Sequence, residues 1–250
     1  MATGGNCARR LIAGVLGGGA LALFAGTAFA GDIASFRPIG FSSDGSVFAF
    51  EEFGVQDGSG FPYSNIFVID TIADRYLPGS PVRVRLDSDG ASLAAAREKA
   101  SQQAAPLLAK HEPTAHPGLL AAFNPVTAVD APPHHLRYLP YAMVPSFGSP
   151  YTLELQEIPQ PPAPRCEGLV ESSATFRLKL VERDGNPADE IVHEDARLPE
   201  SRNCATGYRL GGVMTYHSQD GAPVHVALVL VLSHGFEGSD GRWIAIPFRP

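Results

Sequence analysis

The sequence predicts a mainly β fold, an antiparallel sandwich or rolled sheet, with one helix near residues 90–110. Short runs of β-branched and aromatic residues recur along the chain, and clusters of Gly, Asp, Asn and Ser separate most of them. Only one segment is rich in strong helix formers. A small or incomplete β-propeller is the alternative fold.

The first thirty residues have the pattern of a secretory signal peptide. Arg9 and Arg10 precede an apolar run over residues 11–24, and Ala28-Phe29-Ala30 matches a small-x-small cleavage site. The apolar run is shorter than the roughly 20 residues that span a bilayer. We therefore expect cleavage near Ala30, a periplasmic or secreted protein, and no transmembrane segment in the mature chain.

The remaining residues, 31–250, are enough for a single β-rich domain. Without Arg9 and Arg10, 17 basic residues stand against 26 acidic ones, a net charge of −9 with neutral histidines. An acidic surface disfavours nucleic acids and anionic membranes as partners, because both are bound by clustered Lys and Arg.

Two cysteines, Cys166 and Cys204, remain after the signal peptide and its Cys7 are removed. In an exported domain two cysteines most simply form one disulfide. A reactive thiol pair and metal ligation are the alternatives, but the Cys-x-x-Cys spacing that favours them is missing.

The opening stretch predicts a β-hairpin, with strands over residues 47–52 and 65–70 and a wide Gly-rich loop over 54–63. We expect the two glutamates at the end of the first strand to emerge toward solvent. A loop held on a rigid sheet is a common place for binding residues. The candidate binding residues are Glu51, Glu52, Asp57, Phe61 and Tyr63. The alternative is a plain hairpin loop whose aromatic side chains pack against the sheet.

The helix is predicted over residues 91–105, with N-cap oxygens offered at residues 87–89 and a kink or break at Pro106. A short strand over 82–86 should precede it. The proline-dense segment 112–150 reads as a connection over the surface, with a brief strand at 136–139.

Further strands are predicted toward the C-terminus. Their ranges are 151–156, 176–181, 191–193, 208–216, 224–232 and 243–248. The run 224–232 is apolar without interruption, so we expect a central strand buried on both faces.

The phrase FSSDGSVFAFEEFGVQDGSGFPYSNIFVID resembles the uncharacterised predicted secreted proteins of alphaproteobacteria, a family of unknown function. The resemblance implies an exported protein and supplies no activity. The same phrase is more weakly similar to a blade of TolB-like β-propellers, in which a Ser-x-Asp-Gly turn precedes a buried strand. The phrase is not repeated along the chain, whereas a propeller needs several blades.

No sequence motif for catalysis is found in the mature chain, so no catalytic residue is assigned. We expect a non-enzymatic binding or envelope-interaction protein, whose partner is an unknown protein or small ligand of the cell envelope. One alternative is zinc or copper binding by His217 and His225, which flank an Asp-Gly turn and could face each other across a hairpin. Otherwise no cofactor is expected. The other alternative is a hydrolase whose site forms only in the folded chain.

Overall fold

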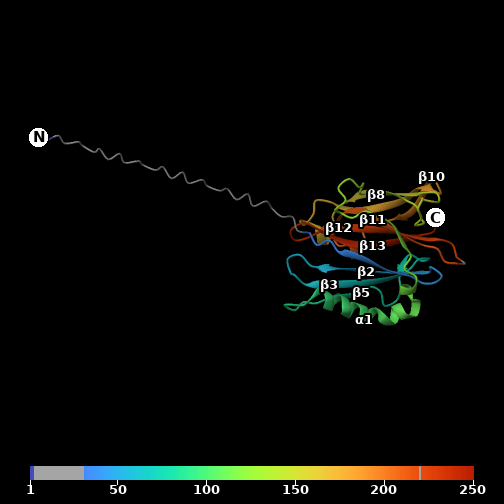
Figure 1. Ribbon diagram of the computed structural model, residues 1–250, viewed down its shortest axis with the longest axis horizontal. Coiled ribbons are helices and arrows are strands. Elements are labelled where there is room, and N and C mark those ends of the chain that lie inside the picture. The colour runs from blue at the N-terminus through green and yellow to red at the C-terminus, as the bar shows by residue number, and fades with distance from the viewer. Residues whose placement is uncertain (3–30, 220) are drawn as a thin grey trace.

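The computed structural model describes residues 1–2, 31–219 and 221–250. Three antiparallel sheets lie face to face, and one helix covers an outer face of the stack (Figure 1). The sandwich prediction is confirmed. The stack is linear and does not close around an axis, so the propeller alternative is wrong. The expected signal peptide and its cleavage site lie almost wholly outside the described residues.

The first sheet contains the opening hairpin. Its strands are β1 (Ser35–Phe41), β2 (Val47–Val55), β3 (Pro62–Asp70), β4 (Arg75–Tyr76) and β5 (Val82–Arg85). Because β2 and β3 pair as far as Val55 and Pro62, the hairpin loop is narrower than predicted and covers residues 56–61. The strand β1 was not predicted, since Pro38 and Gly40 weaken its strand pattern; the ladder has a bulge between them.

The central sheet has the order β13-β12-β11-β6. Its strands are β6 (Leu119–Phe123), β11 (Ala205–Tyr216), β12 (Val224–His234) and β13 (Ser239–Phe248). Alternate residues of β12 pack on the two neighbouring sheets: Leu228 faces the first sheet and Val229 the third. The prediction of a strand buried on both faces is confirmed. The strand β6 lies within the segment that we expected to be a surface connection.

The third sheet has the order β10-β9-β8-β7. Its strands are β7 (His135–Tyr138), β8 (Tyr151–Gln160), β9 (Ser173–Arg183) and β10 (Asn186–Glu194). Asp184 and Gly185 join β9 to β10 and both have positive φ, 47° and 75°. Such a two-residue turn matches the twist of a hairpin.

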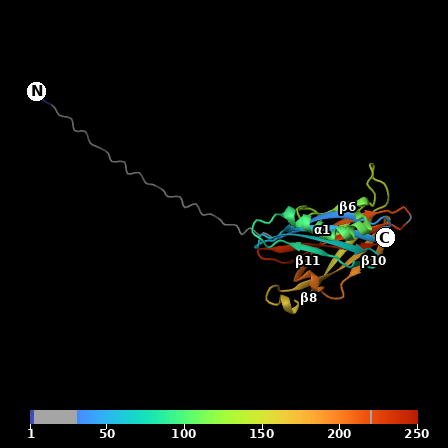
Figure 2. The ribbon, with the colours of Figure 1, turned by 90° about the horizontal axis from the view of Figure 1, so that it is seen from below.

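The helix α1 (Leu93–His111) lies across the outer face of the first sheet (Figures 1 and 2). Ser92 is its N-cap and accepts a hydrogen bond from the Ala95 N–H, so the caps predicted at 87–89 are wrong. Three alanines at helical spacing are fully buried against the sheet: Ala96, Ala100 and Ala104. The helix contains Pro106 and continues beyond it, so the predicted break does not occur.

Cys166 and Cys204 form a disulfide with a Cα–Cα distance of 5.6 Å, as predicted. Cys166 ends the 3₁₀ turn η2 (Pro164–Cys166), and Cys204 follows the turn η3 (Glu200–Arg202) and precedes β11. The disulfide therefore links the loop that contains η3 to the loop between β8 and β9. Among the described residues, no helix combines the length and apolar character needed to cross a membrane.

Candidate binding pocket at the edge of the central sheet

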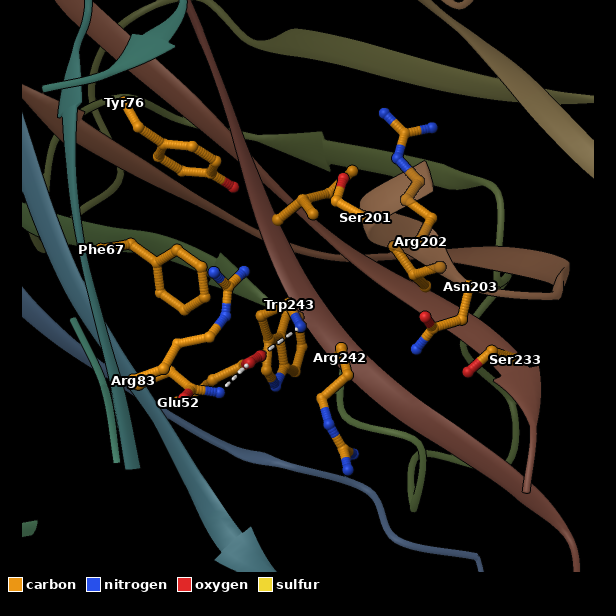
Figure 3. A pocket seen from close by; sticks show the side chains of 13 residues that line it. Glu52, Phe67, Tyr76, Arg83, Ser201, Arg202, Asn203, Ser233, Arg242 and Trp243 are labelled. Atoms are coloured by element: carbon orange, nitrogen blue, oxygen red, sulfur yellow. Dashed lines mark hydrogen bonds between the residues drawn. The ribbon is translucent and has the colours of Figure 1, made fainter. Parts of the chain in front are cut away.

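A pocket of about 180 Å³ lies where the edge strand β13 runs between the first sheet and the η3 turn; we call it the seam pocket (Figure 3). The first sheet contributes Glu52, Phe67 and Arg83 to its wall, and β13 contributes Trp243. The other wall is η3 with the adjoining Asn203, next to the Cys204 disulfide. The pocket is therefore formed by three parts of the chain that are distant in sequence.

At the edge of β13, the side chain of Glu52 accepts a backbone N–H that would otherwise be open to a neighbouring strand. Its Oε2 accepts the N–H of Trp243 at 2.7 Å, and its Oε1 accepts the side-chain N–H of Asn65 at 2.9 Å. On the same edge of β13, the N–H of Gly241 donates to the carbonyl of Asp32 at 2.9 Å. Covering the outward N–H groups in this way blocks further strand pairing there.

The carboxyl group of Glu52 is buried, and the residue is only 3% exposed. Burial raises its pKa, although the hydrogen bonds from Asn65 and Trp243 and the nearby charges of Arg242 and Arg83 act in the opposite direction. The expectation that Glu52 emerges toward solvent is wrong, because β13 packs over this end of β2.

Glu51 points to the opposite face of the sheet and is also buried, at 1% exposure. Arg97 of α1 donates to both of its oxygens at 2.9 Å, and Arg37 and Ser64 donate at 2.6 and 2.9 Å. Burial alone would raise the pKa of Glu51, but the hydrogen bonds from Arg97 and Arg37 lower it below its ordinary value. Every oxygen of Glu51 is used by the protein, so it offers nothing to a ligand.

Three arginines line the seam pocket, and two of them are ion-paired. Arg242 bonds the carboxylate of Asp32, and Arg202 bonds that of Asp195. Arg83 makes no ion pair among the described residues, and its guanidinium carbon lies 5.8 Å from the centre of the Phe67 ring. In Figure 3 its guanidinium group extends between Phe67 and Trp243.

Besides Asn65, the neutral polar side chains of Ser201, Asn203 and Ser233 line the seam pocket. In the part of the chain that the structure describes, none of these side chains has a hydrogen-bond partner. Asn203 has φ 51° and ψ −134°, a strained conformation for a residue with a Cβ, and its carbonyl accepts a hydrogen bond from Arg165 at 3.0 Å. Ser233 is buried, whereas Ser201 and Asn203 are exposed, and all three line the same pocket.

Of the five residues predicted to bind, only Glu52 lines the seam pocket. Tyr63 is buried and donates to Asp32 at 2.9 Å, Phe61 is half-buried, and Asp57 accepts the N–H of Gly58 within the loop. No sequence signal singles out Arg83 or Asn203, because the position of each in the pocket depends on segments far along the chain.

The two histidines predicted as metal ligands lie close together but are not cross-strand partners. The register places Thr215 opposite His225, and the ring centres of His217 and His225 are 6.3 Å apart. His225 is buried, its Nδ1 lies 2.7 Å from the hydroxyl of Tyr138, and burial lowers its pKa to about 3. Within residues 31–219 and 221–250, no three His, Cys, Asp or Glu side chains are grouped closely enough to hold a metal ion.

Comparison with known proteins places the chain in a family. A family model described as "Predicted secreted protein (DUF2259)" matches residues 49–249, which is most of the sequence. No curated protein and no solved structure matches the chain. The match agrees with the resemblance of the opening phrase to uncharacterised predicted secreted proteins, and it includes strands of all three sheets but not β1. The chain therefore belongs to the DUF2259 family of predicted secreted proteins.

Proposed function

We propose that this protein is an exported, periplasmic binding protein that takes a small ligand of the cell envelope into the seam pocket. The observation that carries the proposal is that Arg83, Ser201, Asn203 and Ser233 line one pocket and that their polar heads have no partner among the described residues. Ser233 is buried and the other three are exposed, so their polar groups are available to a ligand that enters the pocket.

The walls of the seam pocket support binding rather than catalysis. Phe67 and Trp243 supply aromatic surface, which contributes much of the binding energy in small pockets. Neither Ser201 nor Ser233 is hydrogen-bonded to a histidine in the described chain, as a hydrolase nucleophile would need.

The test is a thermal-shift screen of small envelope metabolites, neutral and anionic, followed by calorimetric titration of any hit. Arg83→Gln removes the unpaired guanidinium. Arg85→Gln is the matched control, because Arg85 is on the same strand and face but pairs with Asp87 outside the pocket. We expect at least one ligand to raise the melting temperature of the wild type and of Arg85→Gln by similar amounts. The same ligand should raise that of Arg83→Gln much less. A screen without any hit, or equal binding by both variants, would contradict the proposal.

Export with removal of the signal peptide is part of the proposal. The composition of residues 1–30 and membership of a predicted secreted family support it. Intact-mass measurement of protein from the periplasmic fraction should give a chain that begins at Gly31. A chain that keeps Arg9 and Arg10 would contradict cleavage near Ala30.

Zinc or copper binding by His217 and His225 is the second proposal, supported by the approach of the two rings to 6.3 Å and by the uncharged state of His225. Metal analysis of desalted protein should find bound metal in the wild type and none after both histidines are changed to alanine. Equal metal content in the two proteins would exclude this pair.

A further inference from the structure

The seam pocket continues into a second chamber of about 290 Å³, and the two share Tyr76, Ser201, Arg202 and Ile244 in their walls. The second chamber follows β13 toward its C-terminal end. Because they share these residues, the two spaces adjoin along the edge of the central sheet.

The two chambers differ in chemistry. The seam pocket presents Arg83, Asn203 and Ser233, whereas the second chamber adds an apolar wall of Ile69, Pro199, Ala245 and Ile246. The ionisable residues of the second chamber include Asp74, Arg75, His193 and Arg202, and the side chains of Asp74 and His193 are paired with each other at 3.7 Å. A ligand that fills both chambers therefore meets hydrogen-bond donors at one end and the apolar wall of the second chamber at the other.

The charge in the seam pocket favours an anion. Asp32 and Asp195 neutralise Arg242 and Arg202, so the guanidinium group of Arg83 is left without a counter-charge in contact. Glu52, which lines the same pocket, uses its two oxygens to accept N–H groups of Asn65 and Trp243, and burial raises its pKa. Arginine binds carboxylate and phosphate oxygens through parallel N–H donors, with the strength of a charge-assisted hydrogen bond.

Building on the proposed binding function, we propose that the ligand is an amphiphilic anion. Its carboxylate or phosphate head lies against Arg83 in the seam pocket, and its alkyl part lies in the second chamber against Ile69 and Ile246. Serine and asparagine side chains at residues 201, 203 and 233 supply the remaining hydrogen bonds to the head.

The first experiment uses the wild-type protein and a ligand series in calorimetric titrations: acetate, hexanoate, octanoate, octanol and octyl phosphate. Octanoate should bind far more tightly than acetate, by roughly fourfold for each methylene that the second chamber buries. Octanol should bind at least about tenfold more weakly than octanoate, since it lacks the charge that Arg83 pairs with. Octyl phosphate identifies which oxyanion the head site prefers.

The second experiment repeats the octanoate and octanol titrations on Arg83→Gln and Arg85→Gln. Arg83→Gln should lose about tenfold or more in octanoate affinity and leave octanol affinity unchanged, while Arg85→Gln should match the wild type. Circular dichroism establishes that both variants are folded.

The outcomes separate this inference from the proposed function. Equal affinity for octanoate and octanol, or for octanoate and acetate, would overturn the amphiphilic anion, although the pocket would still bind ligands. Failure of the whole series together with a hit of another chemical class in the wider screen would overturn it in the same way. Failure of this series together with a wider screen that finds no hit would overturn the proposed function as well.

Discussion

Glu51 and Glu52 are neighbours in the chain, and they show how differently the two faces of the first sheet are used. Glu51 lies under α1 with Arg97, Arg37 and Ser64 bound to its oxygens, and its pKa is lowered. Glu52 lies on the other face without an arginine in contact, and its pKa is raised. Both are nearly inaccessible to solvent.

Burial of a charged residue alone therefore does not mark a functional site. On the face under α1, Glu51 is ion-paired with Arg37 and Arg97 and the helix covers it, so Glu51 has a structural role. On the β13 side the matching is incomplete, and the unpaired groups line a cavity. Four predictions test this contrast, in order of decreasing expected effect.

Replacing Glu51 by glutamine should cost about 3 kcal/mol of unfolding free energy, because it leaves Arg37 and Arg97 without their buried counter-charge. Urea unfolding at neutral pH measures the loss. Since the pKa of Glu51 is lowered in the folded state, its contribution is present above its ordinary value of 4.5 and is lost as the pH falls below it. Glu51→Gln should therefore lose less stability than the wild type as the pH falls below 4.5. An unfolding free energy equal to that of the wild type at neutral pH would refute a structural role for Glu51.

His193 closes the far end of the second chamber between Asp195 at 3.1 Å and Asp74 at 3.7 Å. Burial would lower its pKa, but these two carboxylates raise it to about 9. A raised histidine pKa stabilises the fold fully below about 6.5, and this stabilisation is lost as the pH rises through 9. We expect a fall on the order of 2 kcal/mol over that window, measured by unfolding at several pH values. His193→Gln should remove it, and an unchanged profile in the variant would contradict this assignment.

Asn203→Gly should raise the unfolding free energy by about 1 kcal/mol, because glycine adopts φ 51°, ψ −134° without strain. The same change deletes a pocket side chain and should weaken ligand binding. Thermal unfolding and titration of one protein sample measure both effects. Lower stability together with intact binding would show that Asn203 is retained for the fold.

Glu52→Gln should cost about 1 kcal/mol of unfolding free energy at neutral pH, because the amide nitrogen that replaces one carboxyl oxygen cannot accept the N–H of Asn65 or of Trp243. A raised carboxyl pKa destabilises the fold as the pH rises above its ordinary value of 4.5. The variant should therefore gain on the wild type over that range in urea unfolding. A loss as large as that of Glu51→Gln would remove the contrast between the two faces.

Much of the fold could be predicted from local pattern. The apolar run of β12 predicted a strand buried on both faces, and two cysteines in an exported domain predicted their bridge. The strands β1 and β6 were missed because their own sequences are weak and their pairing partners stabilise them. Local pattern thus identifies strands that are strong on their own.

The site could be predicted far less well, because its contacts join distant segments. Glu52 looked exposed since it stands at the end of an apolar run, yet the N–H that covers it is 191 residues away in the chain. Glu51 likewise depends on Arg97, 46 residues away. Spacing in the sequence does not reveal that Arg202 and Arg242 each pair with an aspartate. Nor does it reveal that Arg83 has no ion-pair partner among the described residues.

The distance along the chain between the first sheet and β12 has a consequence for the order of folding. The aromatic inner face of the first sheet, including Phe48 and Phe50, is covered by Leu228 and Leu230, which are synthesised long after it. A nascent chain would expose that face until β12 emerged, which favours aggregation. A chain exported before it folds would complete its core only on the far side of the membrane.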